Sequence, residues 1–240
     1  MIKQKNPTKS RYEFYLDMSG TLKKSDDDIY IGCILMPDLF KSSFREKFYR
    51  EFPSLKSYKK KGVGLHPDKL KSIIEYLDKQ KIKMSCVVLK RHTIKQIERE
   101  LKEKFSQFKK IPKGNVSLRF FEERVIASVY FTALSAHAWK GYPYNCFSCM
   151  ETQFDINQSL IALSRICYSN KFHFKVSSIP RRTEHMIKFA DYVASAGKKL
   201  DKFIIEQYSN FVYIGYQANY DHLDVAFGIS RREMPKPKYL

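Results

Sequence analysis

Hydrophobic and polar residues recur along the chain with the periods of both strands and helices. Short apolar runs bounded by turn residues predict strands at 12–18, 28–36, 82–89, 144–152 and 172–177, with a sixth at 211–216. Apolar residues at helical spacing predict helices at 39–51, from His66-Pro67 onward, and at 93–108, 116–139, 156–168 and 183–199. The first two strands are joined by a short polar loop and are expected to form a β-hairpin.

The order of these elements predicts an α/β domain in which helices cover a mixed sheet. No internal repeat or low-complexity linker divides the chain. We therefore expect one domain over residues 1–240, with a core at about 12–199 and a C-terminal extension at 200–240. In such sheets, ligands bind beyond the carboxyl ends of the strands. Residues at strand ends are therefore the first candidates for a site.

The hydropathy of the chain indicates in which cellular compartment the protein resides. The longest apolar runs, such as 29–37 and 125–134, are too short to span a bilayer. Residues 1–11 are basic and polar, without the apolar stretch of a secretory signal. We therefore expect a cytoplasmic protein with no membrane partner.

Charge points to a polyanionic partner. The chain has 44 Lys and Arg against 25 Asp and Glu, a net charge of +19. Such a field attracts nucleic acid, DNA or RNA. A Lys-rich proteome would explain many of the lysines but not the scarcity of acids.

Basic clusters are candidates for phosphate contacts. We expect nucleic acid to meet Lys59, Lys60 and Lys61, Arg181 and Arg182, and Lys198 and Lys199. Solvated surface charge is the alternative for each cluster. Tyr58, Tyr142 and Tyr144 are candidates for stacking on bases.

Asp17 lies near the end of the first predicted strand, one residue after Leu16 in an apolar run and two residues before Ser19-Gly20. Strand alternation places it on one face with Glu13 and Tyr15. A carboxylate held on a sheet and facing its open end suits metal-dependent phosphodiester cleavage. Aspartate is also common in turns, so the motif alone leaves both interpretations open.

Asp191 is the only acid between Glu184 and Asp201, and it lies within a predicted helix among Ala, Phe and Val. Aspartate is unfavourable inside a helix, and an unpaired buried carboxylate is costly. We therefore expect a partner for Asp191, either a basic group or a metal. An exposed or salt-bridged carboxylate is the alternative.

Further acids and histidines are weaker candidates. Glu151 directly follows the fourth predicted strand and is the preferred third acid, whereas Asp155 is either a ligand or the N-cap of the next helix. Glu123, near the start of a helix, is either a ligand or a complement to the helix dipole. His66 and His185 are candidate accessory residues. Cys146 and Cys149 form a lone CxxC pair, more typical of core positions than of a metal site.

Four segments together resemble a known family. FYLDMSG, DIYIGCILMP, LHPDKL and SSIPRRTEHMIKFADYVASAGKKL are similar to motifs of domain-of-unknown-function family 3800. The resemblance covers about residues 12–199. It implies a ribonuclease H-like fold, nuclease activity, and an acidic site made by Asp17, Glu151 and Asp191.

The resemblance also implies a mechanism. Asp17 would bridge two divalent ions, Mg²⁺ or Mn²⁺, about 3.5–4 Å apart, and Glu151 and Asp191 would complete the ligand set. These acids would then cleave a phosphodiester bond by metal-dependent hydrolysis.

The departures from the family pattern favour a second hypothesis. Met18, Thr21, Gly64 and Ser177 stand where family members often carry acids. The chain could therefore be a degenerate nucleic-acid-binding subunit with a protein partner in a defence or mobile-element complex. A structural protein whose charge reflects only its proteome is the third hypothesis.

Overall fold

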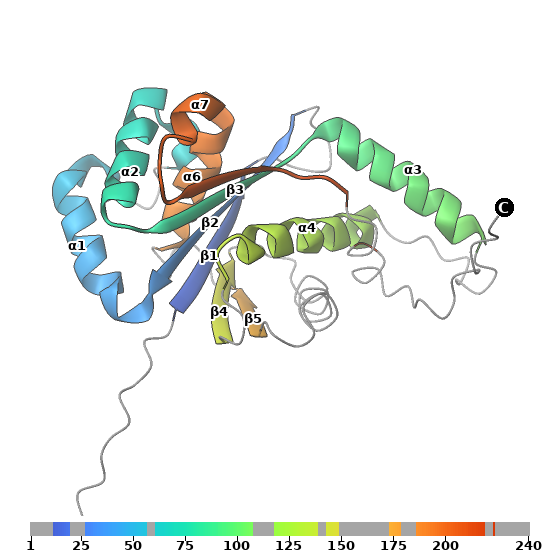
Figure 1. Cartoon of the computed structure of the whole chain (residues 1–240), viewed down its shortest axis with the longest axis horizontal. Helices are drawn as coiled ribbons and strands as arrows, with labels where there is room; N and C mark the ends of the chain where they lie inside the picture. Colours follow the sequence, from blue (N-terminus) through green and yellow to red (C-terminus); the bar gives the residue numbers. More distant parts are fainter. Residues whose placement is uncertain are drawn as a thin grey trace, which may run out of the picture.

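The structure is a computed structural model, and it describes residues 12–19, 27–56, 61–107, 118–138, 143–148, 173–178, 186–218 and 223. Within these ranges, one mixed sheet of six strands runs in the order β5-β4-β1-β2-β3-β6, with helices on both faces (Figure 1). The predicted α/β class, with a mixed sheet and flanking helices, is confirmed. None of the described helices is long and apolar enough to cross a membrane.

The strands are β1 (Tyr12–Ser19), β2 (Ile29–Pro37), β3 (Lys83–Leu89), β4 (Pro143–Ser148), β5 (His173–Ser178) and β6 (Phe211–Gly215). β1 and β2 form the predicted antiparallel hairpin, and β3 continues it antiparallel to β2. β4 lies parallel to β1, β5 parallel to β4, and β6 parallel to β3. The carboxyl ends of β1, β4 and β5 therefore meet at one edge of the sheet.

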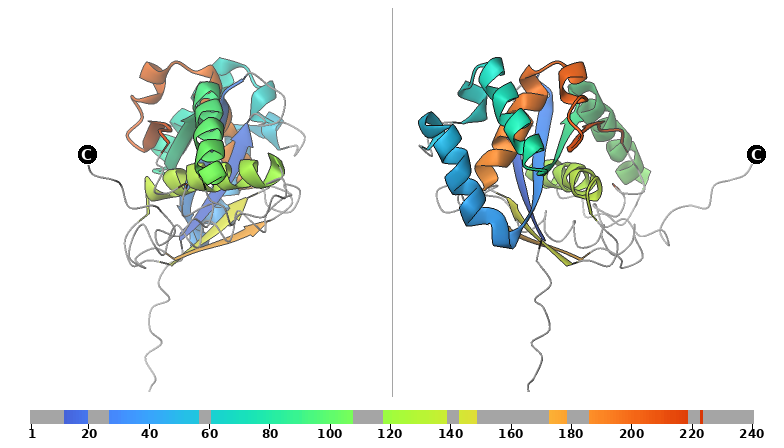
Figure 2. Two further views of the ribbon diagram at one scale, coloured as in Figure 1. Left: turned by 90° about the vertical axis from the view of Figure 1, so that its right-hand side faces the viewer. Right: turned by 60° about the vertical axis from the view of Figure 1, so that its left-hand side comes forward.

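The helices are α1 (Lys41–Glu51), α2 (Pro67–Lys79), α3 (Arg91–Gln107), α4 (Leu118–Ser135), α6 (Ile187–Lys199) and the short α7 (Lys202–Ile205). Short 3₁₀ turns occur at η1 (Asp38–Phe40), η2 (Pro53–Leu55) and η3 (Gly62–Gly64). α1, α2 and α6 lie on one side of the sheet and α4 on the other (Figure 2). The helix predicted at 156–168 lies outside the described residues.

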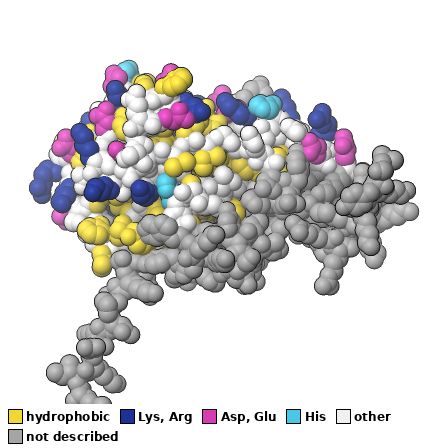
Figure 3. All heavy atoms as spheres, viewed as in Figure 1, with side chains coloured by type: hydrophobic (Ala, Val, Ile, Leu, Met, Phe, Trp, Pro, Cys, Tyr) yellow, Lys and Arg dark blue, Asp and Glu magenta, His cyan; other side chains and the backbone are white. Residues whose placement is uncertain are grey.

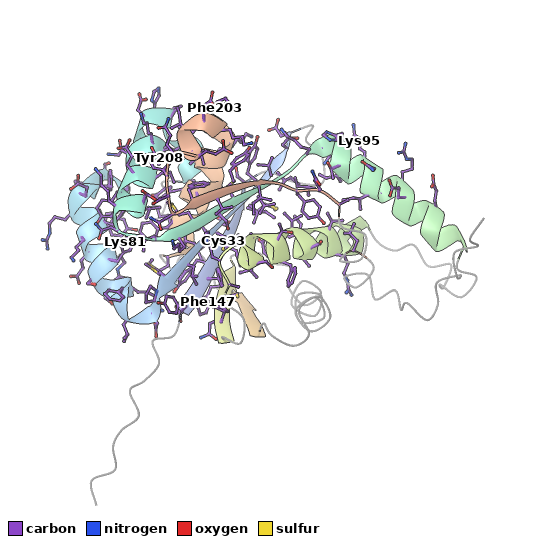
Figure 4. The ribbon with its side chains drawn as sticks, in the orientation of Figure 1. Cys33, Lys81, Lys95, Phe147, Phe203 and Tyr208 are labelled. Atoms are coloured by element: carbon purple, nitrogen blue, oxygen red, sulfur yellow. The ribbon has the colours of Figure 1, made fainter. Side chains whose placement is uncertain are left out.

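Side-chain alternation along the strands divides the core into two clusters, one on each face of the sheet. Phe14 and Leu16 of β1 pack with α4, whereas Tyr15 packs with α1, α2 and α6. Phe147 of β4, which is labelled in Figure 4, stacks on Tyr15 with ring centroids 5.3 Å apart. The predicted division of β1 into two faces is thus confirmed. It also places Asp17 on the α6 face.

The face covered by α6 requires small residues. A Cβ added to Gly32 of β2 would lie 2.5 Å from the backbone nitrogen of Ala194 and closer still to the carbonyl oxygen of Ala190. The helix backbone therefore rests directly on the strand, and its alanines make this approach possible. Residues 187–197 of α6 are all buried as a result.

Two aromatic residues differ from the sequence-based expectation. Phe40 falls within the helix predicted at 39–51, but it lies in η1 before α1 begins and is 59% exposed. Tyr144 was a candidate for base stacking, but it is buried in the α4-side core against Phe14. Alternation in β4 turns its ring inward.

Candidate acidic site

Asp17 lies near the carboxyl end of β1 and is 1% exposed. Its Oδ1 accepts a hydrogen bond of 2.9 Å from the backbone N–H of Met18. The neighbouring residue Leu16 pairs with Ser148, the last residue of β4. Asp17 therefore lies near the end of β1, as the sequence predicts, and the structure adds that the parallel strand β4 ends beside it.

Asp191 lies inside α6, between two alanines that touch the sheet. Ala190 and Ala194 contact β2 at Gly32, and Gly32 is the cross-strand partner of Asp17. Paired residues in an antiparallel ladder point to the same face. The two predicted aspartates, far apart in sequence, therefore belong to the same region of one sheet face.

The partner of Asp191 is a backbone amide. Its Oδ2 accepts a hydrogen bond of 2.7 Å from the N–H of Gly62, and the side chain is 6% exposed. The sequence predicted a basic group or a metal as partner, whereas the partner that the described residues supply is this backbone N–H. Among those residues, Oδ1 of Asp191 has no hydrogen-bond donor, so this oxygen is available to a ligand.

Other polar side chains of α6 hold the same segment of chain. Lys188 donates to the carbonyl oxygen of Leu55, and Lys199 donates to those of Val63 at 2.6 Å and Leu65 at 2.8 Å. Together with Asp191, these residues form a stripe that we call the α6 polar stripe. It fastens both ends of the basic segment 56–61 against the helix that carries Asp191.

Hydroxyl groups near Asp191 complete the surroundings. Ser195 Oγ and Tyr192 Oη are buried and have no hydrogen-bond partner among the described residues. Burial raises the pKa of Tyr192 well above its usual value, and the nearby Tyr49 and Asp191 add to the increase. Both hydroxyls are therefore neutral hydrogen-bonding groups at physiological pH.

The predicted nucleic-acid contacts lie in different settings. Lys61 is exposed, whereas Lys198 pairs with Asp27 at 3.0 Å. Lys199 donates hydrogen bonds to the carbonyl oxygens of Val63 and Leu65. Lys and Arg side chains also gather over α1 (Figure 3). Lys61 is thus a described, exposed lysine, and the next residue, Gly62, is bonded to Asp191.

His66 serves as a helix cap. It precedes Pro67, and its Nδ1 accepts a hydrogen bond of 3.4 Å from the N–H of Asp68. The side chain is exposed. This geometry accounts for the histidine by local structure at the start of α2.

Several predicted site residues lie outside the described part of the chain: Glu151, Asp155, Lys59, Lys60, Arg181, Arg182 and His185. Glu123 lies in α4, but its side chain is among those not described. In the described ranges, no three His, Cys, Asp or Glu side chains form a group that could hold a metal ion. The described site thus consists of Asp17, Asp191 and their hydrogen-bonding neighbours.

Of the two cysteines in the CxxC pair, the structure describes Cys146. Cys146 is a free, buried thiol in the α4-side core, and burial raises its pKa well above the usual value. Cys149 lies outside the described residues. Cys146 therefore packs as a small apolar residue.

Sequence reasoning missed Gly62, Tyr192 and Ser195. The last two flank Asp191 at positions i+1 and i+4, and helical periodicity would have placed Ser195 on its face. Gly62 had a weaker signal, a Gly-Val-Gly turn after a run of lysines. Neither pattern specifies which backbone amide meets Asp191.

A scan against models of protein families and a search of curated proteins found no match for this chain.

Proposed function

We propose that this protein is a ribonuclease H-like nucleic-acid phosphodiesterase that uses Mg²⁺ or Mn²⁺. One observation carries the proposal: Asp17, at the carboxyl end of β1, and Asp191, on the helix covering that strand, belong to the same region of one sheet face. Two carboxylates from distant parts of a chain form such an arrangement in metal-dependent hydrolysis of phosphodiesters.

The topology supports the proposed fold identity. An antiparallel meander of β1, β2 and β3 is extended beyond β1 by the parallel strands β4 and β5. A mixed sheet of this kind, covered by helices on both faces, is compatible with the ribonuclease H-like fold that the resemblance implies. β6 adds a further strand at the β3 edge.

The donor set fits a hard divalent cation. Asp191 retains one oxygen without a hydrogen-bond donor among the described residues, and Asp17 is a second buried carboxylate on that face. Carboxylate oxygens are the ligands that Mg²⁺ and Mn²⁺ prefer. In the proposed site, Asp17, Asp191 and Glu151 would hold the metal, with Asp155 and Glu123 as further candidates.

Each group of this chain has a separate role in the proposed reaction. Asp17 and Asp191 would supply carboxylate oxygens as metal ligands. The Gly62 amide keeps the Asp191 carboxylate in one orientation. Lys61, with the predicted contacts at Lys59, Lys60, Arg181 and Arg182, would hold the phosphate backbone. When bound, a divalent ion lowers the pKa of the attacking water and stabilises the leaving oxygen.

The position of the basic segment supports a polyanionic substrate. The α6 polar stripe holds Leu55 on one side of the predicted contacts Lys59, Lys60 and Lys61, and Gly62, Val63 and Leu65 on the other. Of these lysines, Lys61 is described, and it is exposed. The net charge of +19 favours the same class of ligand. A phosphate backbone on these lysines would pass close to the proposed acidic site.

A second candidate function is binding without cleavage. Met18, Thr21, Gly64 and Ser177 replace acids that the family pattern often carries. The loss of accessory acids weakens metal binding more than nucleic-acid binding, because the latter depends on lysines and arginines. In this version, the chain holds nucleic acid for a protein partner.

The deciding experiment compares wild type with Asp17→Asn and Asp191→Asn on labelled single- and double-stranded DNA and RNA, in EDTA, Mg²⁺ or Mn²⁺. Asparagine at 191 can still accept the Gly62 hydrogen bond, so the fold is retained. Glu13→Gln is the matched control, because Glu13 is a buried acid on the same face of β1 that pairs with Lys41 at 2.6 Å.

We expect metal-dependent cleavage by wild type and Glu13→Gln, with no cleavage by either aspartate variant. Salt-sensitive binding by all four proteins, with no cleavage by any of them, would instead support the binding-only function. Cleavage that survives in both aspartate variants would contradict the proposed site.

A further inference from the structure

The turn η3 is built around a glycine that touches α6. A Cβ added to Gly62 would lie 2.5 Å from Ser195 Oγ, 2.7 Å from Ser195 Cβ and 2.9 Å from the carbonyl oxygen of Asp191. Gly64, two residues later in the same turn, faces open space. Only the first of the two glycines is therefore required by packing.

The close approach of Gly62 to α6 allows a hydrogen bond to Asp191. It brings the Gly62 N–H to 2.7 Å from Oδ2 of Asp191. A hydrogen bond to a buried carboxylate is short and directional, and it fixes the rotation of the carboxyl group. With Oδ2 engaged, Oδ1 is the oxygen left for a ligand.

A second residue of α6, Lys199, also holds the turn. Lys199 donates to the carbonyl oxygens of both Val63 and Leu65. These contacts restrain the backbone that presents the Gly62 amide. The amide is therefore a fixed donor, and its position is set by α6 itself.

We propose that Gly62 is a positioning residue: its amide orients Asp191 for metal binding, and no residue with a side chain can replace it there. This inference rests on the proposed function, because it concerns the metal that Asp191 would hold. Gly62 acts through Asp191 and touches neither metal nor substrate.

The test measures two affinities of the full-length protein. Mn²⁺ binding is measured by calorimetry, and binding of a labelled oligonucleotide in EDTA is measured by fluorescence anisotropy. The variants are Gly62→Ala and the matched control Gly64→Ala, which places the same methyl group into open space in the same turn.

Loss of a hydrogen bond that orients a metal ligand typically lowers metal affinity by about 10- to 100-fold. We expect at least about a tenfold loss of Mn²⁺ affinity in Gly62→Ala. Its oligonucleotide affinity in EDTA should match wild type, because the lysine side chains are unchanged. Gly64→Ala should match wild type in both measurements.

A purely structural role would give a different pattern. In that case, Gly62→Ala would lose Mn²⁺ and oligonucleotide affinity together, or neither, and the inference would be overturned. The double variant Gly62→Ala/Ser195→Gly removes the two nearest atoms of the clash, so its Mn²⁺ affinity should recover toward wild type. If Gly62→Ala does not fold, the double variant carries the test, and a folded double variant with no Mn²⁺ affinity would overturn the inference. Circular dichroism of each variant checks the fold.

Failure of the proposed function has its own signature. If wild type binds no Mn²⁺ and cleaves no substrate, the metal-dependent function fails and this inference fails with it. If wild type binds Mn²⁺ and both alanine variants do so equally well, only the role of Gly62 is refuted.

Discussion

Gly32 offers a quantitative test of how α6 packs on the sheet. In Gly32→Ala, the new methyl group would lie 2.5 Å from Ala194 N and closer still to Ala190 O. Ordinary contacts of a Cβ begin at 3.4 Å, so α6 must move by more than about 0.9 Å, because Ala190 O lies closer than Ala194 N. Both obstructing atoms belong to helix backbone and cannot rotate away.

The cost follows from the rigidity of this contact. Overpacking a core typically costs about 1–3 kcal/mol, and backbone obstruction places Gly32→Ala at the upper end, about 3 kcal/mol. For a chain of this size, that corresponds to a decrease of about 6–12 °C in Tm. A shift of α6 would also move Asp191 relative to Asp17.

The assay is urea unfolding followed by far-UV circular dichroism. Gly215→Ala is the matched control, because Gly215 is also a strand glycine and its added Cβ would meet nothing within 4 Å. We expect the control to remain within about 0.5 kcal/mol of wild type. A similarly small change in Gly32→Ala would refute the proposed contact between α6 and β2.

Two further predictions concern pH and helix anchoring. Burial lowers the pKa of His137 below its usual 6.5, although the hydrogen bond to Met84 opposes this. The unfolded chain then binds the proton more readily, so the free energy of unfolding should fall as pH drops through about 6.5. The His137→Gln variant should lose less stability than wild type between pH 7.5 and 5.5. An equal loss in both proteins would contradict a lowered pKa of His137. Asp28 accepts from Arg91 N at 2.9 Å and Lys90 Nζ at 2.8 Å, anchoring the start of α3. Asp28→Ala should cost about 1 kcal/mol in urea unfolding, and the exposed Asp27→Ala less; equal effects would refute the anchor.

The pKa of Asp28 gives that anchor a pH signature. Burial acts to raise it, but the hydrogen bonds from Lys90 and Arg91 outweigh burial, so the pKa lies below its usual 3.8. A carboxylate whose pKa is lowered on folding stabilises the protein above the unfolded pKa. The contribution of Asp28 should therefore be present at neutral pH and lost as pH falls below about 3.8.

Local pattern alone determined much of the fold. Alternation in β1 separated Tyr15 from Phe14 and Leu16, and the structure places them on opposite faces. The helix predicted from His66-Pro67 onward is α2, and its apolar residues at helical spacing are buried, at Leu70, Ile73, Ile74 and Leu77. Such features follow from sequence because one strand or helix buries one face, and its period records which residues that face contains.

The sequence also identified the need for a partner at Asp191, since an isolated carboxylate inside an apolar helix requires one. It could not identify the partner. A backbone N–H belongs to every residue except proline, so nothing in the residue type marked Gly62 as the donor. The same limit hid the carbonyl oxygens that bind Lys188 and Lys199.

Only the tertiary structure decided how the elements lie side by side. It placed β4 beside β1, β6 at the β3 edge, and α6 directly on Gly32. These arrangements join segments far apart in the chain, and they depend on the shape and packing of both partners together. Sequence periodicity determines which face an element buries, whereas the fit between two buried faces exists only once the chain has folded.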